Sequence, residues 1–252
     1  MNIPVMRGMI DRRILVNFRV APEVLERLLP GPFRPVVVCE WGMAGICLIR
    51  LSGIRPHGIP ARFGISSENA AHRIAVEWEK AGRRHEGVFI PRRDTSSRFN
   101  AWAGGRLFPG FHHHSEFRVD ERNGTLAIQM RNRADGTLIE LRVRGAVELP
   151  RTSVFATPGE ASEFFRRGAL GYSVSERPNQ LDALELRSSQ WRVEPLAVDL
   201  IESSFFADES LFPPGAVDFD SALLMRNVPH EWHAKEPLYC GEEKRCTLFQ
   251  TH

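Results

Sequence analysis

Two dipeptides, Asn123-Gly124 and Asp135-Gly136, constrain the fold more than any other feature of the sequence. Both favour the left-handed backbone that a two-residue β-hairpin turn requires. Between and after these turns, apolar and polar residues alternate, which is typical of strands with one buried and one solvated face. The apolar positions are Leu126, Ile128, Met130, Ile139, Leu141 and Val143. This part of the chain therefore predicts an antiparallel meander.

Short strands are predicted in the rest of the chain as well. Apolar and β-branched runs indicate strands at 14–20, 36–39, 43–51, 72–79, 85–90, 194–200 and 221–226. The segments 53–64 and 91–97 are predicted to be irregular, the stretch after Tyr172 is predicted to be poor in strands, and the tail from Lys235 is predicted to be peripheral.

A few short helices accompany these strands. Pro22 begins a predicted helix that Pro30 ends, and a helical turn is expected at 98–103. Thr157 and Glu160 form a capping-box pattern for a helix that runs to Gly168, and a further short helix is predicted near 201–207. Because strands and helices do not alternate, we predict a mainly β (α+β) fold: one domain over residues 1–252, an antiparallel β-barrel or sandwich with short capping helices.

Charge and cysteine content limit the classes of function. The formal net charge is only +2, with 33 Lys plus Arg against 31 Asp plus Glu, so neither nucleic acid nor a membrane surface is an expected partner. The N-terminal segment lacks the apolar stretch of a secretory signal, and we expect a cytoplasmic protein. Reduced thiols are expected at all four cysteines, Cys39, Cys47, Cys240 and Cys246.

Residues 101–117 combine glycines, an arginine and three consecutive histidines in an aromatic setting. The Pro109-Gly110 break predicts that a strand begins near Phe111. On that strand His113 points to one face, and His112, His114 and Glu116 point to the other. One interpretation of His112, His114 and Glu116 is a metal-binding triad. The simpler interpretation is a solvated polar face of the strand.

Several segments together resemble the acetoacetate decarboxylase-like superfamily, in particular its YqjF-like branch. They are LVNFRVAPEVLERLLPGPF at 15–33, SSEN at 66–69 and AGGRLFPGFHHH at 103–114. The resemblance implies a closed pocket for a small organic acid or carbonyl compound. The chemistry of this superfamily uses a lysine that forms an imine with a keto acid, and acetoacetate decarboxylase is a standard example of an activated lysine.

Aligned on Gly105 and Arg106 without gaps, the family's lysine position falls on His113, which cannot form such an imine. The resemblance implies that His113 and Glu68 are catalytic acid–base residues. It also implies that His114, Arg106 and either Arg12 or Arg13 contact the substrate. The three lysines of the chain, Lys80, Lys235 and Lys244, are predicted to lie in a turn and in the tail.

Three functions remain open from the sequence. The first is an enzyme of lyase- or hydrolase-like proton-transfer chemistry without a cofactor, and the second is a non-catalytic protein that binds a small ligand. The third is a metal-dependent enzyme that uses His112, His114 and Glu116. A homo-oligomer is plausible in each case, because exposed sheet edges favour assembly.

Overall fold

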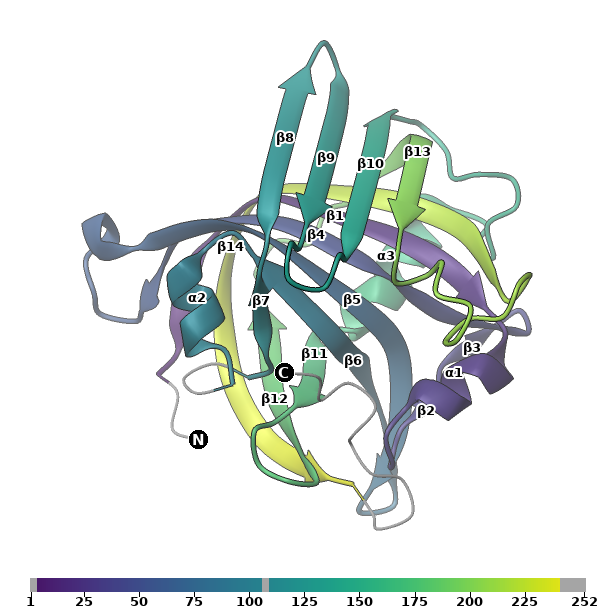
Figure 1. Ribbon diagram of the computed structural model, residues 1–252, viewed down its shortest axis with the longest axis horizontal. Helices are drawn as coiled ribbons and strands as arrows, with labels where there is room; N and C mark the ends of the chain where they lie inside the picture. The colour runs from purple at the N-terminus through teal and green to yellow at the C-terminus, as the bar shows by residue number, and fades with distance from the viewer. Residues whose placement is uncertain (1–3, 106–108, 241–252) are drawn as a thin grey trace.

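The computed structural model describes residues 4–105 and 109–240, and it confirms the mainly β fold (Figure 1). The strands are β1 (Met6–Val20), β2 (Arg34–Pro35), β3 (Val37–Val38), β4 (Trp41–Pro56), β5 (Ile65–Lys80), β6 (Arg83–Thr95), β7 (His112–His114), β8 (Glu116–Arg122), β9 (Thr125–Arg131), β10 (Leu138–Gly145), β11 (Leu170–Val174), β12 (Gln180–Arg187), β13 (Glu194–Ser203) and β14 (Val217–Tyr239). The helices are α1 (Pro22–Leu28), α2 (Arg98–Ala103) and α3 (Pro158–Arg167), with a 3-10 turn at Ala61–Phe63.

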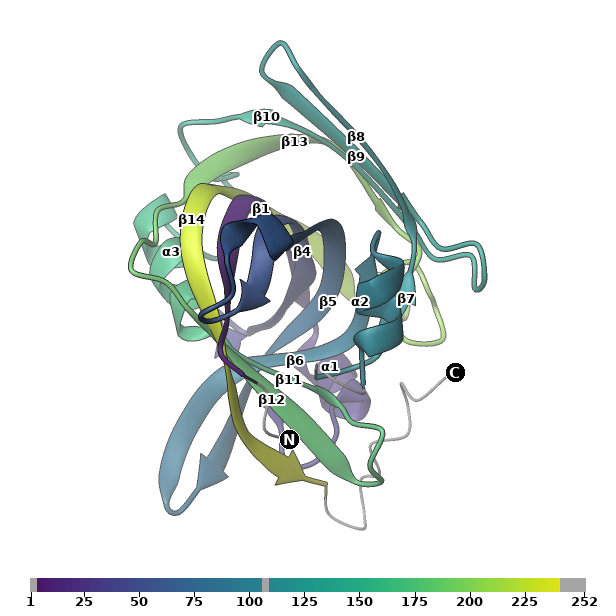
Figure 2. The same cartoon turned by 90° about the vertical axis from the view of Figure 1, so that its left-hand side faces the viewer.

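Seven of these strands form a closed ring, in the order β1-β4-β5-β6-β11-β12-β14, because β14 also pairs with β1. Most neighbours in the ring are antiparallel, but β6 pairs with β11 in parallel, so the sheet is mixed rather than purely antiparallel. Figure 2 shows the ring from the side, with β14 and β1 adjacent.

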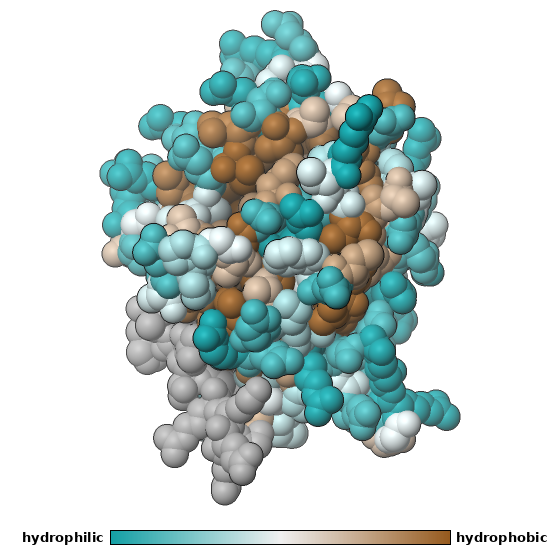
Figure 3. All heavy atoms as spheres, turned by 90° about the vertical axis from the view of Figure 1, so that its right-hand side faces the viewer, coloured by the Kyte–Doolittle hydropathy of each residue, from teal (hydrophilic) through white to brown (hydrophobic). Residues whose placement is uncertain are grey.

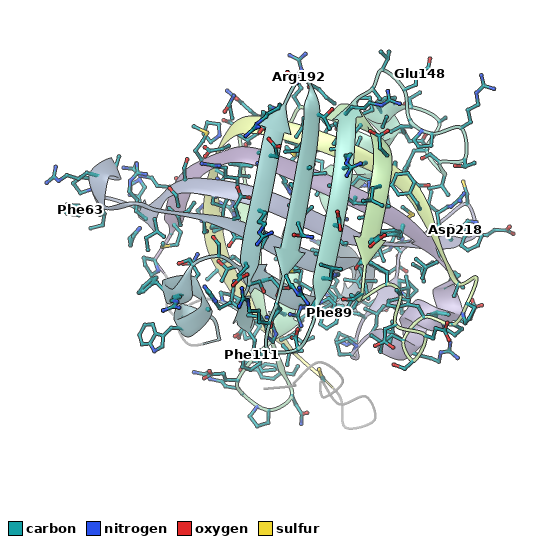
Figure 4. The ribbon with its side chains drawn as sticks, turned by 45° about the horizontal axis from the view of Figure 1, so that its top comes forward. Phe63, Phe89, Phe111, Glu148, Arg192 and Asp218 are labelled. Atoms are coloured by element: carbon teal, nitrogen blue, oxygen red, sulfur yellow. The ribbon has the colours of Figure 1, made fainter. Side chains whose placement is uncertain are left out.

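A second layer, formed by β13, β10, β9 and β8, continues from the N-terminal half of β14. Figure 4 shows these four strands lying across the strands of the ring. The main core lies between the two layers: Ile14 and Ile74 from the ring belong to the same buried cluster as Ile128 and Leu141. The predicted meander is therefore the outer layer.

Long-range pairing accounts for the differences from the predicted elements. The irregular segments predicted at 53–64 and 91–97 are partly strand, since β4 runs to Pro56, β5 begins at Ile65 and β6 runs to Thr95. The predicted helix near 201–207 is wrong, because β13 continues to Ser203. The prediction of few strands after Tyr172 missed β12, and residues 235–239, which begin the predicted peripheral tail, are part of β14.

The cysteine prediction is confirmed in part. Cys39 and Cys47 are free, whereas Cys240 is disulfide-bonded, so the expectation of four reduced thiols is wrong at Cys240. Over the described ranges, no helix is long and apolar enough to cross a membrane. On the side that carries α1 and β3, Figure 3 shows apolar side chains in patches between polar ones.

Candidate functional site

A cavity of about 200 Å³ lies inside the ring, and every strand of the ring contributes to its wall. One wall residue from each strand is Arg13, Cys47, Arg73, Arg93, Gly171, Leu184 and Trp232. α3 adds Phe164 and Phe165, which belong to a second buried cluster with Leu15 and Met43. The wall is largely apolar, with a small number of polar groups, as is usual for a small-molecule site.

Three of the polar wall residues are arginines, which come from β1, β5 and β6. Arg73 is only 5% exposed, donates a hydrogen bond from Nη2 to Oδ1 of Asn17, and lies 4.7 Å from the centroid of the Phe165 ring. Arg13 donates from Nε to the Cys47 sulfur at 3.3 Å. Arg93 donates from Nε to Ser173 Oγ at 3.2 Å. All three arginines have neutral hydrogen-bond partners.

No Asp or Glu of the described residues forms an ion pair with Arg13, Arg73 or Arg93. The Arg73 Nε and the Arg13 Nη1 are buried and have no hydrogen-bond partner. Burial, with a smaller contribution from the nearby Arg13, lowers the pKa of Arg73 to about 10. Burial likewise lowers the pKa of Arg93 to about 10. The cavity wall thus carries three positive charges without a counter-ion from these parts of the chain.

The carboxylates of the wall already have other partners. Asp94, which is fully buried, accepts two hydrogen bonds from Arg92, both at 2.8 Å, and a third from Ser115 Oγ at 2.8 Å. Glu86 lies 3.6 Å from both Arg84 and Arg167. Neither carboxylate neutralises the three cavity arginines.

His112 is another polar residue of the wall. It lies on β7, which pairs with β6 so that His112 is opposite Arg93. Its Nδ1 is 3.0 Å from the carbonyl oxygen of Gly110, which can only accept, so Nδ1 carries the proton and Nε2 carries the lone pair. Burial lowers the pKa of His112 to about 3, with Arg93 contributing, so the ring is neutral at physiological pH.

The backbone around His112 depends on glycine. A Cβ atom at Gly104, which follows α2, would lie only 2.4 Å from the His112 Nδ1. Gly110 has a positive φ of 79°, and a Cβ there would lie 2.6 Å from Ser173. The glycines that marked this segment in the sequence therefore allow the chain to pack tightly against the histidine.

The structure separates the predicted site residues between the two faces of the ring. Arg13 lines the cavity, whereas Arg12 points to the other face, where it bonds Glu68 at 2.6 Å and lies 3.9 Å from Glu121 of β8. Burial raises the pKa of Glu68, and the attraction of Arg12 only partly opposes this. Neighbouring residues of a strand point to opposite faces. Of the two arginines between which the sequence left the choice open, Arg12 therefore lies in a structural ion pair and Arg13 lies in the cavity wall.

The histidines show the same alternation. His112 lines the cavity and His113 does not; His113 is opposite Asp94, and burial together with Arg92 lowers its pKa. His114 is exposed. Arg106 lies outside the described residues. The catalytic roles of His113 and Glu68 and the ligand contacts of Arg12, His114 and Arg106 stay predictions, while Arg13 is the predicted site residue that the structure places at the cavity.

The proposed metal triad is not assembled. Within the described residues, 4–105 and 109–240, no three His, Cys, Asp or Glu side chains are grouped so that they could hold a metal ion. Glu116 instead forms an ion pair with Arg133 at 2.8 Å, and the Nδ1 of His112 is bonded to Gly110. His112, His114 and Glu116 therefore do not form the ligand set that the sequence suggested.

Two of the three lysines lie in the described chain, and both lie away from the cavity. The ammonium group of Lys80 lies 2.7 Å from Glu236, and that of Lys235 lies 3.1 Å from Glu185. The side chain of Lys235 is 35% exposed. Lys244 lies outside the described residues.

The sequence did not predict Arg73, Arg93 or His112 as residues of a cavity wall. A signal was available for Arg73, because it is a lone cation within the apolar strand 72–78. Arg93 had no such signal, since residues 91–97 were taken as irregular and no face could be assigned to it.

The comparison with protein families decides the classification. The profile of the DUF2071 family, described as "Uncharacterized conserved protein (COG2071)", matches residues 9–225. The chain belongs to this family. The family is the YqjF-like one, so the predicted resemblance is confirmed. No functionally curated protein matches this DUF2071 chain in sequence.

Solved structures show the same fold at low sequence identity. Acetoacetate decarboxylase from Legionella pneumophila subsp. pneumophila str. Philadelphia 1 is 13% identical with a TM-score of 0.61, over 92% of this chain and 87% of that one. An acetoacetate decarboxylase-like enzyme from Sphingomonas wittichii RW1 is 12% identical with a TM-score of 0.61, over 96% and 95%. The enduracididine biosynthesis enzyme MppR, solved with pyruvate, is 11% identical with a TM-score of 0.62, over 97% and 93%. The acetoacetate decarboxylase-like fold is thereby confirmed.

Proposed function

We propose that this protein binds a small organic anion, a carboxylate that also carries a carbonyl group, in the cavity of the ring. The observation that carries the proposal is the set of three arginines, Arg13, Arg73 and Arg93, whose charges meet no carboxylate of the described residues. A buried charge without a partner is costly, so such a set is expected where a ligand supplies the opposite charge. Arginine also matches the planar geometry of a carboxylate.

The positions of the lysines argue against imine chemistry as the activity of this site. Lys80 and Lys235 are held by glutamates outside the cavity wall. If the protein is an enzyme, proton transfer is the reaction type that the wall supports. His112 is neutral, holds its proton on Nδ1 through the Gly110 carbonyl, and keeps the Nε2 lone pair as a proton acceptor.

A titration calorimetry experiment tests the binding proposal. We expect pyruvate or acetoacetate to bind, and a neutral ketone such as acetone to bind far more weakly. Arg93→Met should weaken carboxylate binding about thirtyfold, which corresponds to ~2 kcal/mol for loss of one partner of a buried charge pair. Arg34→Met is the matched control, because Arg34 is an exposed arginine on β2. Equal affinity for the acid and the ketone would refute the proposal.

The two neighbouring histidines separate an enzyme from a binding protein. If the cavity catalyses proton exchange at the carbon next to the ligand carbonyl, His112→Ala abolishes the exchange of deuterium into the bound keto acid. His113→Ala, one position away on the opposite face, is the matched control and also tests the predicted catalytic role of His113. Binding without exchange in the native protein identifies a non-catalytic ligand-binding protein.

Two other expectations, a cytoplasmic location and assembly into a homo-oligomer, stay predictions. Small metabolic acids are abundant in the cytoplasm, which agrees with the proposed ligand class. Light scattering of the purified protein would establish its oligomeric state.

A further inference from the structure

Cys47 is the one sulfur-containing side chain of the described cavity wall. It lies in the middle of β4, where Leu15 of β1 and Ala71 of β5 are its direct neighbours. It is free and only 8% exposed. A buried cysteine is by default a small apolar side chain, so its surroundings must decide whether it does more.

Cys47 belongs to the apolar cluster that includes Leu15 and Met43, but a cation also contacts its sulfur. Arg13 donates a hydrogen bond from Nε to its sulfur at 3.3 Å. Arg73 and Arg93 line the same cavity wall. The sulfur is thus held at the wall by one of the three arginines that we propose bind the carboxylate.

An independent observation points to a ligand at the same place. Arg73 is 5% exposed, lines the cavity, and has a buried Nε without a hydrogen-bond partner. The Nη1 of Arg13 is also buried and unpartnered. A carboxylate that satisfied these two donors would share the guanidinium group of Arg13 with the Cys47 sulfur, because Arg13 holds the sulfur through its Nε.

We infer that Cys47 is a nucleophile that attacks an electrophilic carbon of the anion held by Arg13 and Arg73. For a 2-oxo acid, a bond forms between the Cys47 sulfur and the carbonyl carbon while the π bond of the carbonyl breaks. The thiol proton ends on the carbonyl oxygen, and no other reactant is needed. This inference rests on the proposed function, because the arginines must first bind the carboxylate.

A pair of alkylating reagents tests the inference. Iodoacetate and iodoacetamide deliver the same carbon to sulfur, with iodide leaving and the thiol proton passing to the buffer, but only iodoacetate carries a carboxylate. The rate of each reaction at Cys47 is followed in the folded protein by mass spectrometry of peptides. Cys39, which is free and exposed, is the internal control.

We expect the ratio of the iodoacetate rate to the iodoacetamide rate to be at least about tenfold higher at Cys47 than at Cys39, the equivalent of ~1.4 kcal/mol. Pyruvate should protect Cys47 and leave Cys39 unchanged. Arg13→Met should bring the ratio at Cys47 down to that at Cys39, while Arg34→Met should not.

Equal ratios at the two cysteines in the native protein would overturn the inference, and so would a Cys47 that stays unmodified while Cys39 reacts. Neither result depends on whether a variant folds. If pyruvate still binds in the calorimeter, only the role of Cys47 fails; if no carboxylate binds, the proposed function fails as well.

Discussion

Replacing Arg73 by Met should change the stability of the ligand-free protein very little, although Arg73 is deeply buried. The fall of its pKa from 12.5 to about 10 corresponds to roughly 3 kcal/mol of unfavourable charge burial, which the substitution removes. The substitution also loses the hydrogen bond to Asn17, which contributes about 1–3 kcal/mol, and the contact with the Phe165 ring, which contributes ~1 kcal/mol. These contributions nearly cancel, so we expect a change within about 2 kcal/mol of zero.

Arg92→Met is the comparison, because Arg92 is a cation on the adjacent strand that does have a counter-ion, although its side chain is 14% exposed. Burial alone would lower its pKa, but the hydrogen bonds and charges of Asp94 and Asp135 outweigh this and raise it. Removing Arg92 leaves the fully buried Asp94 without its ion pair, which costs about 3–5 kcal/mol. The same change from arginine to methionine should therefore leave the stability nearly unchanged at Arg73 on β5 and lower it strongly at Arg92 on β6.

Urea unfolding at pH 7 measures both variants, with the slope of the transition as a check that the unfolded states are comparable. Arg73→Met should unfold near the native midpoint and lose carboxylate binding, whereas Arg92→Met should unfold at a much lower urea concentration. If Arg73→Met is as unstable as Arg92→Met, the charge of Arg73 is satisfied within the fold and the argument for a bound anion fails.

Three further predictions concern the fold around the cavity. His72 is fully buried, and burial lowers its pKa from 6.5 to about 4. The unfolded chain therefore binds a proton more tightly than the folded one, and stability falls by ~3 kcal/mol in total as the pH drops from 6.5 to 4. The unfolding of His72→Leu should lack this dependence, and a pH profile equal to that of the native protein would contradict the prediction. A Cβ at Gly45 would lie 2.3 Å from the Val16 carbonyl oxygen, so Gly45→Ala should lower the free energy of unfolding by about 1–3 kcal/mol. A Cβ at Gly145 would meet open space, so Gly145→Ala should be nearly neutral in the same urea assay. The Thr157 side chain accepts a hydrogen bond from the Glu160 amide at 3.1 Å, so Thr157→Ala should lower the melting temperature by an amount that corresponds to ~1 kcal/mol, and an unchanged value would exclude a role for the cap.

Local patterns in the sequence predicted the fold class well. The meander around Asn123 and Asp135, the hairpin of β5 and β6 and the capping box of α3 all depend on residues that are close in the chain. The pairing of β12 with β14 depends on the distant segment 231–239 and carries no local signal, and it makes residues 235–239, which begin the predicted peripheral tail, part of the ring. Long-range pairing of this kind cannot be read from periodicity in one segment.

The site was harder to predict than the fold, and the reason is geometric. The ungapped alignment places the family's lysine position at His113, which does not line the cavity, whereas its neighbour His112 does. On a strand an error of one residue moves a side chain to the opposite face. The pair Arg12 and Arg13 shows the same sensitivity, because Arg13 lines the cavity and Arg12 bonds Glu68.

A crystal structure of the protein with bound pyruvate would show whether the ligand lies in the cavity of the ring. We expect the carboxylate inside the ring, in hydrogen-bond contact with the guanidinium groups of Arg13 and Arg73 and with its carbonyl carbon beside Cys47. Pyruvate bound on the opposite face, among Arg12, Glu68 and His113, would contradict the assignment of the cavity as the site, and so would a cavity that stays empty at saturating pyruvate.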